Sequence, residues 1–258
     1  MLTVALLRWE KHLEDTGAEP LLPRRLLRAP GFPLSMLTVV VFFSGNAGLF
    51  LVLTYHLQSG IGLPPLAAGL VFVPLGAGFI AASAASRRLA ARFGITTSVV
   101  GATVVAAGLA LVPLATGHPP ATQQWLLAAV MALSGLGQAL VVAPLVETVL
   151  ARVHTDDAGA GSGVLNTLTQ AGMALGVAAI GTLYRTALGT NPDTPSPDTT
   201  TTDYTHAFNL TTLTLALLAR TVAALCLRLR HTPARDTVST SAVPSHPSAA
   251  DPRKPPSA

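Results

Sequence analysis

The chain has little charge and almost no cysteine. Only 11% of its 258 residues are Asp, Glu, Lys or Arg, and Cys226 is the single cysteine. One cysteine excludes an intrachain disulfide and a multi-cysteine metal site, so neither thiol redox nor zinc chemistry is expected. The chain also lacks a His-Glu-x-x-His, a Gly-x-Ser-x-Gly, a P-loop and a clustered aspartate pair. We therefore expect no enzyme activity, no metal and no cofactor.

The composition also differs from that of a water-soluble domain, in which about a quarter of the residues are charged. Half of the residues are hydrophobic and the mean hydropathy is +0.53. The net charge of +4 comes from 16 Lys and Arg residues, but these lie beside apolar runs and form no basic helix face. Nucleic-acid binding is therefore not expected.

The apolar residues are gathered into six long runs. About 20 apolar residues in a helix cross a hydrocarbon core of roughly 30 Å, and lipid accepts only backbone whose hydrogen bonds are satisfied internally. The sequence therefore predicts an all-α polytopic membrane protein whose medium is the lipid bilayer. We place its six spans at residues 36–57, 66–85, 95–116, 125–149, 162–184 and 207–227.

Three regions follow from these spans. Residues 1–35 are interpreted as the end of a preceding helix plus a charged cytoplasmic loop, and residues 36–227 as a six-helix transmembrane bundle. Residues 228–258 are rich in Pro, Ser and Thr and are expected to be a disordered tail. Lys and Arg gather in every second connection, which predicts cytoplasmic termini and a multi-pass protein of the cell membrane.

Several amides lie inside the spans. Ser162, Asn166 and Gln170 recur every four residues and form a polar stripe on one face of the fifth span. Asn46 in the first span and Gln138 in the fourth also need a partner or a wet cavity within hydrocarbon. Two readings of such amides stay open: they line a solute path, or they hydrogen-bond neighbouring helices as structural contacts.

Small residues suggest close helix packing. Gly172 and Gly176 form a Gly-x-x-x-Gly pair beside the polar stripe, where a neighbouring helix is expected to approach closely. Prolines interrupt the helical hydrogen-bond ladder and, together with nearby glycines, are expected to allow bends. The residues concerned are Pro74, Pro144, Gly69, Gly76, Gly78, Gly135 and Gly137.

Two charged residues lie inside the expected spans. Glu147 is the only carboxylate among them, and a charge at the bilayer centre costs roughly 2.5 to 3.5 kcal/mol. It is a candidate proton relay, although its place near the inner end of its span also lets it reach water. Arg220 in the last span either snorkels to the boundary or pairs with an acid.

Three stretches resemble the C-terminal half of a major facilitator superfamily transporter of the fourteen-helix drug:proton antiporter type. The first is Tyr55-His-Leu-Gln58, followed shortly by GIGLPPLAAGLVFVP. The second is the basic stretch RRLAARFG from Arg87 to Gly94. The third and most specific is DDAGAGSGVLNTLTQAGMALGVAAIGTLY, which ends at Tyr184.

The resemblance implies that the chain comprises helices nine to fourteen of such a multidrug exporter. It further implies efflux of small amphipathic solutes in exchange for protons, by rocking of two helix bundles about a central site. We expect a fragment from a truncated or split reading frame, not competent alone, that needs an N-terminal half of six to eight helices. The substrate pathway is then expected at Asn46, Gln138, Asn166 and Gln170.

The alternative hypothesis comes from another class of protein. It is a non-transporting assembly or regulatory subunit of the membrane, which packs against another helix bundle through the face that carries Gly172 and Gly176.

Overall fold

The computed structural model describes residues 31–151, 158–192, 194, 196–197 and 199–230. Most of the expected N-terminal loop and of the expected tail therefore lies outside the described residues. Within the described ranges the elements are helical, apart from one isolated bridge between Asn191 and Thr194. The predicted all-α fold is confirmed for this part of the chain.

Six helical segments are long and apolar enough to cross a membrane, which confirms the predicted spans. Each expected range agrees with one observed segment, and the observed helices extend by a turn or more beyond several predicted ends. The segments are α3 (Phe32–Tyr55) continued by the wider π-helical turn η1 (His56–Gly60), α4 (Pro65–Phe93), α5 (Thr96–Ala110) with α6 (Val112–Ala115), α7 (Pro120–Leu150), α8 (Ala158–Leu188) and α9 (Thr201–Arg230).

Proline and glycine mark several helix ends. α4 begins at Pro65 and α7 at Pro120, where the missing N–H of proline leaves no intrahelical bond unmade. α4 is followed by Gly94 with φ 56°, a left-handed conformation that favours glycine. The third span is interrupted at Leu111, two residues before Pro113, so it consists of α5 and α6.

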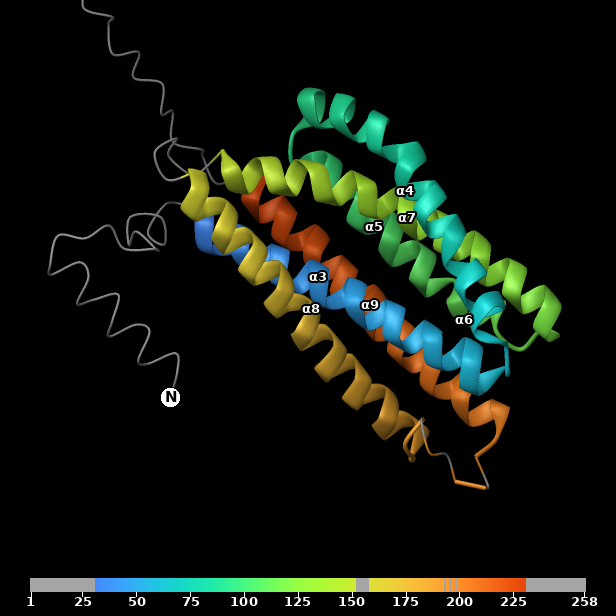
Figure 1. Cartoon of the computed structure of the whole chain (residues 1–258). Coiled ribbons are helices and arrows are strands. Elements are labelled where there is room, and N and C mark those ends of the chain that lie inside the picture. Colours follow the sequence, from blue (N-terminus) through green and yellow to red (C-terminus); the bar gives the residue numbers. More distant parts are fainter. Residues whose placement is uncertain (1–30, 152–157, 193, 195, 198, 231–258) are drawn as a thin grey trace, which may run out of the picture.

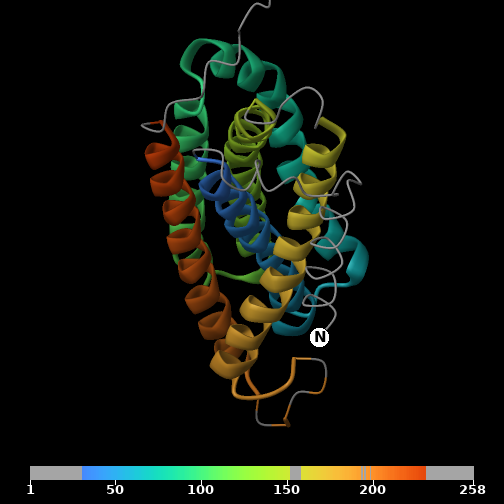
Figure 2. The same cartoon turned by 90° about the vertical axis from the view of Figure 1, so that its left-hand side faces the viewer.

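The helices form two groups of three. α3 packs against α8 and α9, while α7 packs against α4 and α5, and contact between α5 and α9 joins the groups. Figure 2 shows α5 and α9 along one side of the bundle and α4 and α8 along the other, with α3 and α7 between them. Within the described residues α4 and α8 do not pack against each other.

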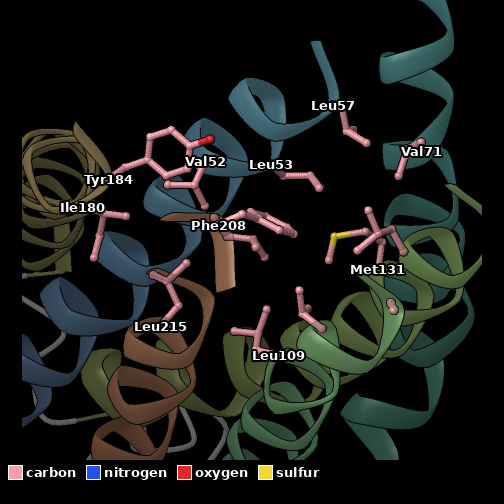
Figure 3. Close-up of a cluster of buried hydrophobic side chains, with 14 of the residues drawn as sticks. Val52, Leu53, Leu57, Val71, Leu109, Met131, Ile180, Tyr184, Phe208 and Leu215 are labelled. Atoms are coloured by element: carbon pink, nitrogen blue, oxygen red, sulfur yellow. The ribbon is translucent and has the colours of Figure 1, made fainter. Parts of the chain in front are cut away.

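A hydrophobic cluster joins the two groups. Figure 3 shows side chains from every span, among them Leu53, Val71, Leu109, Met131 and Phe208, converging on the interior. A second cluster, which includes Phe32, Met36 and Val149, lies nearer the opposite end of the bundle. Large apolar side chains also lie on the outside, such as Leu66 and Ile80, which are 79% and 74% exposed. These outer side chains are suited to lipid or to another helix bundle rather than to water.

Candidate functional site

Two of the amides predicted from the sequence meet in the interior. Asn46 on α3 donates from Nδ2 to Oε1 of Gln138 on α7 over 2.7 Å, and Gln138 is only 6% exposed. The pair connects the central helices of the two groups. Each amide thereby satisfies part of its hydrogen-bonding capacity, which would be expensive to leave unmet in an apolar interior.

A small cavity adjoins this pair. Its volume is about 30 Å³, and its described lining comes from α3, α5, α7 and α9. That space suits a water molecule and is far below the roughly 300 to 1,000 Å³ of sites for drug-sized ligands. The lining is otherwise mainly apolar: Val41, Phe42, Gly45, Leu49, Ala102, Val105, Leu109, Leu215, Leu218, Ala219 and Val222.

The other two predicted amides lie elsewhere. Asn166 and Gln170 are exposed on α8 and do not line the cavity beside Asn46 and Gln138. They lie 8 and 12 residues after the first residue of α8, or about 12 and 18 Å along its axis. The structure therefore divides the four predicted residues into an internal pair and an outward-facing pair.

Gly172 and Gly176 lie where α8 crosses α3. A methyl group built on Gly172 would come within 2.9 Å of the Val40 carbonyl oxygen, and one on Gly176 would overlap the Ser44 carbonyl. The Ser44 hydroxyl donates to the carbonyl of Gly172 over 2.7 Å. This glycine face is occupied within the chain, so the subunit alternative has no free surface there.

Four glycines of α4, α5 and α7 also sit at helix crossings, namely Gly78, Gly101, Gly135 and Gly137, whereas Gly69 and Gly76 of α4 have no atom within 4 Å of an added methyl group. A methyl group on Gly135 would overlap the backbone of Leu75, and one on Gly137 would approach the carbonyl of Gly101 at 2.7 Å. α4 and α7 run unbroken through their internal prolines, Pro74 and Pro144. The four crossing glycines therefore allow close contact between helices, whereas the sequence predicted bends at Gly78, Gly135 and Gly137.

Sequence reasoning missed a buried polar contact between η1 and α7. His56, at the start of η1, has no exposed surface, and its Nε2 lies 2.6 Å from Nε2 of Gln123 on α7. Its ring stacks on Phe208 of α9 with centroids 4.2 Å apart. Neither partner could be identified from sequence spacing, because both lie in spans distant along the chain.

The two charged residues of the spans lie away from the amide pair. Glu147 is exposed near the end of α7, nine residues beyond Gln138 and thus about 14 Å away along the helix. Arg220 is exposed on α9 and lines a groove between α9 and α5. The structure therefore places both charges outside the cavity.

Six membrane-spanning helices around an apolar interior with a few paired polar side chains define a multi-pass helical membrane protein. The family model for the Major Facilitator Superfamily matches residues 3–177, which is more than half of the chain. The chain belongs to this superfamily of membrane transporters, and the family resemblance is confirmed.

Relatives of the chain bear the names of exporters and resistance proteins. A probable actinorhodin transporter of Streptomyces coelicolor is 32% identical over 191 residues, covering 72% of this chain and 32% of that protein. The puromycin resistance protein pur8 of Streptomyces alboniger is 33% identical over 257 residues, covering 96% of this chain and 50% of that protein. The multidrug efflux pump LfrA of Mycolicibacterium smegmatis is 29% identical over 183 residues, covering 71% of this chain and 36% of that protein. The chain thus spans about a third to a half of the length of these relatives.

Proposed function

We propose that this bundle is one half of a proton-coupled exporter of small amphipathic compounds, and that it corresponds to the last six of fourteen helices. Membership of the superfamily supports the proposal, as do relatives named for antibiotic transport, antibiotic resistance and multidrug efflux. Those relatives are about two to three times as long as the part that aligns with this chain. A partner of six to eight helices is proposed to supply the other half of the transport site.

The observation that carries the proposal is the exposure of Asn166 and Gln170 in the membrane part of α8. An amide that faces hydrocarbon loses its hydrogen bonds to water, at a cost of several kcal/mol on alkane scales. Such residues are therefore expected to face a wet pathway or a second bundle instead of lipid. The side of the bundle formed by α4 and α8 is our candidate for the contact with that second half.

The internal pair fits the same scheme. Asn46 and Gln138 border a space of about 30 Å³, which is too small for a drug. A solute would bind only after α3 and α7 separate, or between these helices and the facing half. In either case binding exchanges the Asn46–Gln138 hydrogen bond for contacts with solute or water, as expected for a site that opens and closes.

Glu147 is our candidate for a proton-carrying group. The other described carboxylate of the spans, Asp203, accepts hydrogen bonds from the N–H and hydroxyl of Thr200 at the start of α9. Glu147 is exposed near the end of α7, where it can exchange protons with water. Glu147→Gln is expected to remove the pH dependence of export while leaving the fold intact.

The orientation of the bundle is a further part of the proposal. Arg87, Arg88 and Arg92 lie near the end of α4, and Arg228 and Arg230 lie at the end of α9. Figure 1 shows these two helix ends at the same end of the bundle, opposite the connection between α8 and α9. By the positive-inside rule we propose that this end faces the cytoplasm, with both termini on the cytoplasmic side.

Export by an assembled two-half protein tests the function. The chain is fused to the part of the Streptomyces alboniger puromycin resistance protein that it does not match, and extrusion of ethidium from energised cells is followed by fluorescence. We expect extrusion from the fusion and none from the chain alone. Asn166→Ala with Gln170→Ala is expected to slow extrusion at least tenfold at an unchanged protein level.

The matched control is Thr182→Ala. Thr182 is also exposed on α8, but its hydroxyl donates to the carbonyl of Ala178 in its own helix. This variant should extrude ethidium as fast as the parent fusion. Unchanged extrusion by the double amide variant would remove the pathway assignment, and efficient extrusion by the chain alone would contradict the need for a second half.

A further inference from the structure

A groove runs along the outside of the bundle between α5 and α9. Its volume is about 720 Å³, and the two helices that line it lie on the side of the bundle opposite α4 and α8 in Figure 2. The described lining comes from positions that recur at helical spacing on both helices. Those residues are Thr103, Ala106, Ala107 and Ala110 of α5, and Leu213, Ala216, Leu217, Arg220, Ala223, Ala224 and Leu227 of α9.

Arg220 is the one charged side chain of this described lining. It lies eight residues before Arg228, which is about 12 Å along the helix axis. Arg228 and Arg230 are in the last turn of α9 and are expected at the polar boundary of the bilayer. Arg220 therefore lies closer to the bilayer centre than that boundary. The described lining of the groove contains no carboxylate to pair with it.

A guanidinium at this depth needs an anion or water. The guanidinium of arginine stays charged in proteins, and an unpaired cation in hydrocarbon costs several kcal/mol. The bilayer itself supplies anions in the form of lipid phosphates, and the planar fork of arginine binds phosphate through two parallel hydrogen bonds. Charge complementarity thus favours a phospholipid headgroup at the part of the groove that contains Arg220.

The alanines suit the rest of the same molecule. Their small side chains leave a furrow that is about 21 Å long from Leu213 to Leu227 on α9. A furrow of this length with an apolar lining suits an extended hydrocarbon chain.

We propose that the groove between α5 and α9 is a binding site for one anionic phospholipid. Arg220 holds the phosphate, and one acyl chain lies along the alanines towards Leu213. The lipid comes from the leaflet that contains Arg228 and Arg230. Its headgroup moves towards the bilayer centre, and the side chain of Arg220 extends towards the polar boundary to meet it. The site is separate from the amide pair and does not depend on export.

Native mass spectrometry of the full chain tests the site. The chain is purified in detergent and titrated with phosphatidylglycerol or with phosphatidylcholine of the same acyl chains, and the fraction carrying one lipid is measured. We expect tighter retention of phosphatidylglycerol by the parent chain. Arg220→Gln should weaken it at least tenfold, while Arg220→Lys should retain part of the difference between the two lipids.

Two further variants separate charge from shape. Ala107 is exposed in the groove, so Ala107→Phe fills the groove without changing the charge and should also weaken retention of phosphatidylglycerol. Ala84 is exposed on α4 outside the groove, and Ala84→Phe should leave that retention unchanged. Arg185→Gln, which removes a cation from α8, is the control for net charge. Far-ultraviolet circular dichroism must show the same helix content in each variant.

The results that overturn the proposal are equally specific. Equal retention of phosphatidylglycerol by the parent and by Arg220→Gln would exclude Arg220 as the phosphate ligand. If Arg185→Gln loses as much retention as Arg220→Gln, the effect comes from net charge and not from a site at Arg220. A photo-crosslinking residue at position 107 should form adducts with lipid in membranes. Adducts with a protein segment in place of lipid would assign the groove to a helix and contradict the lipid site.

Discussion

The amide of Asn46 on α3 donates to the amide oxygen of Gln138 on α7 over 2.7 Å and joins the central helices of the two groups. α3 and α7 belong to different groups of three, which otherwise meet mainly where α5 packs against α9. In the proposed export scheme, α3 and α7 separate to admit a solute, and this bond is then exchanged for contacts with solute or water.

A double-mutant cycle measures the strength of this bond. Asn46→Ala and Gln138→Ala are each expected to lower the free energy of unfolding by about 1 to 2 kcal/mol, because the remaining amide is left without its partner. The double variant should lose less than the sum, with a coupling energy of about 0.6 to 1.7 kcal/mol, as for hydrogen bonds between membrane helices. Denaturant unfolding in detergent gives all four values.

The control for that cycle is Thr182→Ala. Its exposed hydroxyl donates to the carbonyl of Ala178 in its own helix, so its removal should change the free energy of unfolding by less than about 0.5 kcal/mol. A coupling energy of zero between Asn46 and Gln138 would mean that the pair contributes nothing to holding the groups together.

Gly176→Ala is expected to destabilise the chain. The added methyl group would overlap the Ser44 carbonyl, so α8 has to move away from α3 and weaken the hydrogen bond from Ser44 to Gly172. Overpacking of this kind costs about 1 to 3 kcal/mol. Thermal unfolding in detergent, followed by circular dichroism, measures the loss.

The same helix offers a matched control at Gly163. A methyl group there would meet no atom within 4 Å, and Gly163→Ala should therefore stabilise α8 by about 0.5 to 1 kcal/mol. Equal effects at the two positions would show that helix propensity dominates and that the approach of α8 to α3 is not tight.

Gln123→Leu is expected to destabilise the chain by about 1 to 3 kcal/mol. The buried imidazole of His56 would lose its side-chain partner at 2.6 Å while its stacking on Phe208 remains. The adjacent Gln124 is only half-buried, and Gln124→Leu should change stability by less than about 0.5 kcal/mol. If Gln123→Leu is as stable as the parent, the contact between Gln123 and His56 adds nothing to stability.

Cysteine labelling tests the proposed orientation. His118 lies in the turn between α6 and α7, whereas Ala91 is exposed beside Arg92 at the basic end of α4. In intact cells a membrane-impermeant maleimide should label His118→Cys at once and Ala91→Cys only after permeabilisation. The parent chain, whose Cys226 is buried, gives the background, and the reverse labelling pattern would invert the proposed topology.

Hydropathy was sufficient to predict the spans, because lipid requires long helices of apolar residues wherever the chain crosses it. The exact ends were less predictable. The first span continues through η1 beyond the predicted end at residue 57, and the last helix begins at Thr201 before the predicted start at residue 207. Polar residues such as Gln58 and Asp203 extend a helix beyond the hydrophobic run that defines a span.

The side-chain partners were harder to predict than the spans. A repeat of four residues places Asn166 and Gln170 on one face of a helix, but it does not tell which neighbour that face meets. The structure places this face outside and the Asn46–Gln138 pair inside. Gly135 and Gly137 show the same limit, because a glycine that permits a bend and one that permits a close crossing look alike in a sequence.

Proton flux in proteoliposomes tests the central claim most directly, namely that these six helices are one half of a proton-coupled exporter. The chain, its fusion to the second half, and the fusion with Glu147→Gln are reconstituted with a pH-sensitive dye inside the vesicles. We predict that added ethidium raises proton flux only in the fusion and that Glu147→Gln reduces this flux at least tenfold. Ethidium-dependent flux through the chain alone, or a fusion that moves no protons, would contradict the account.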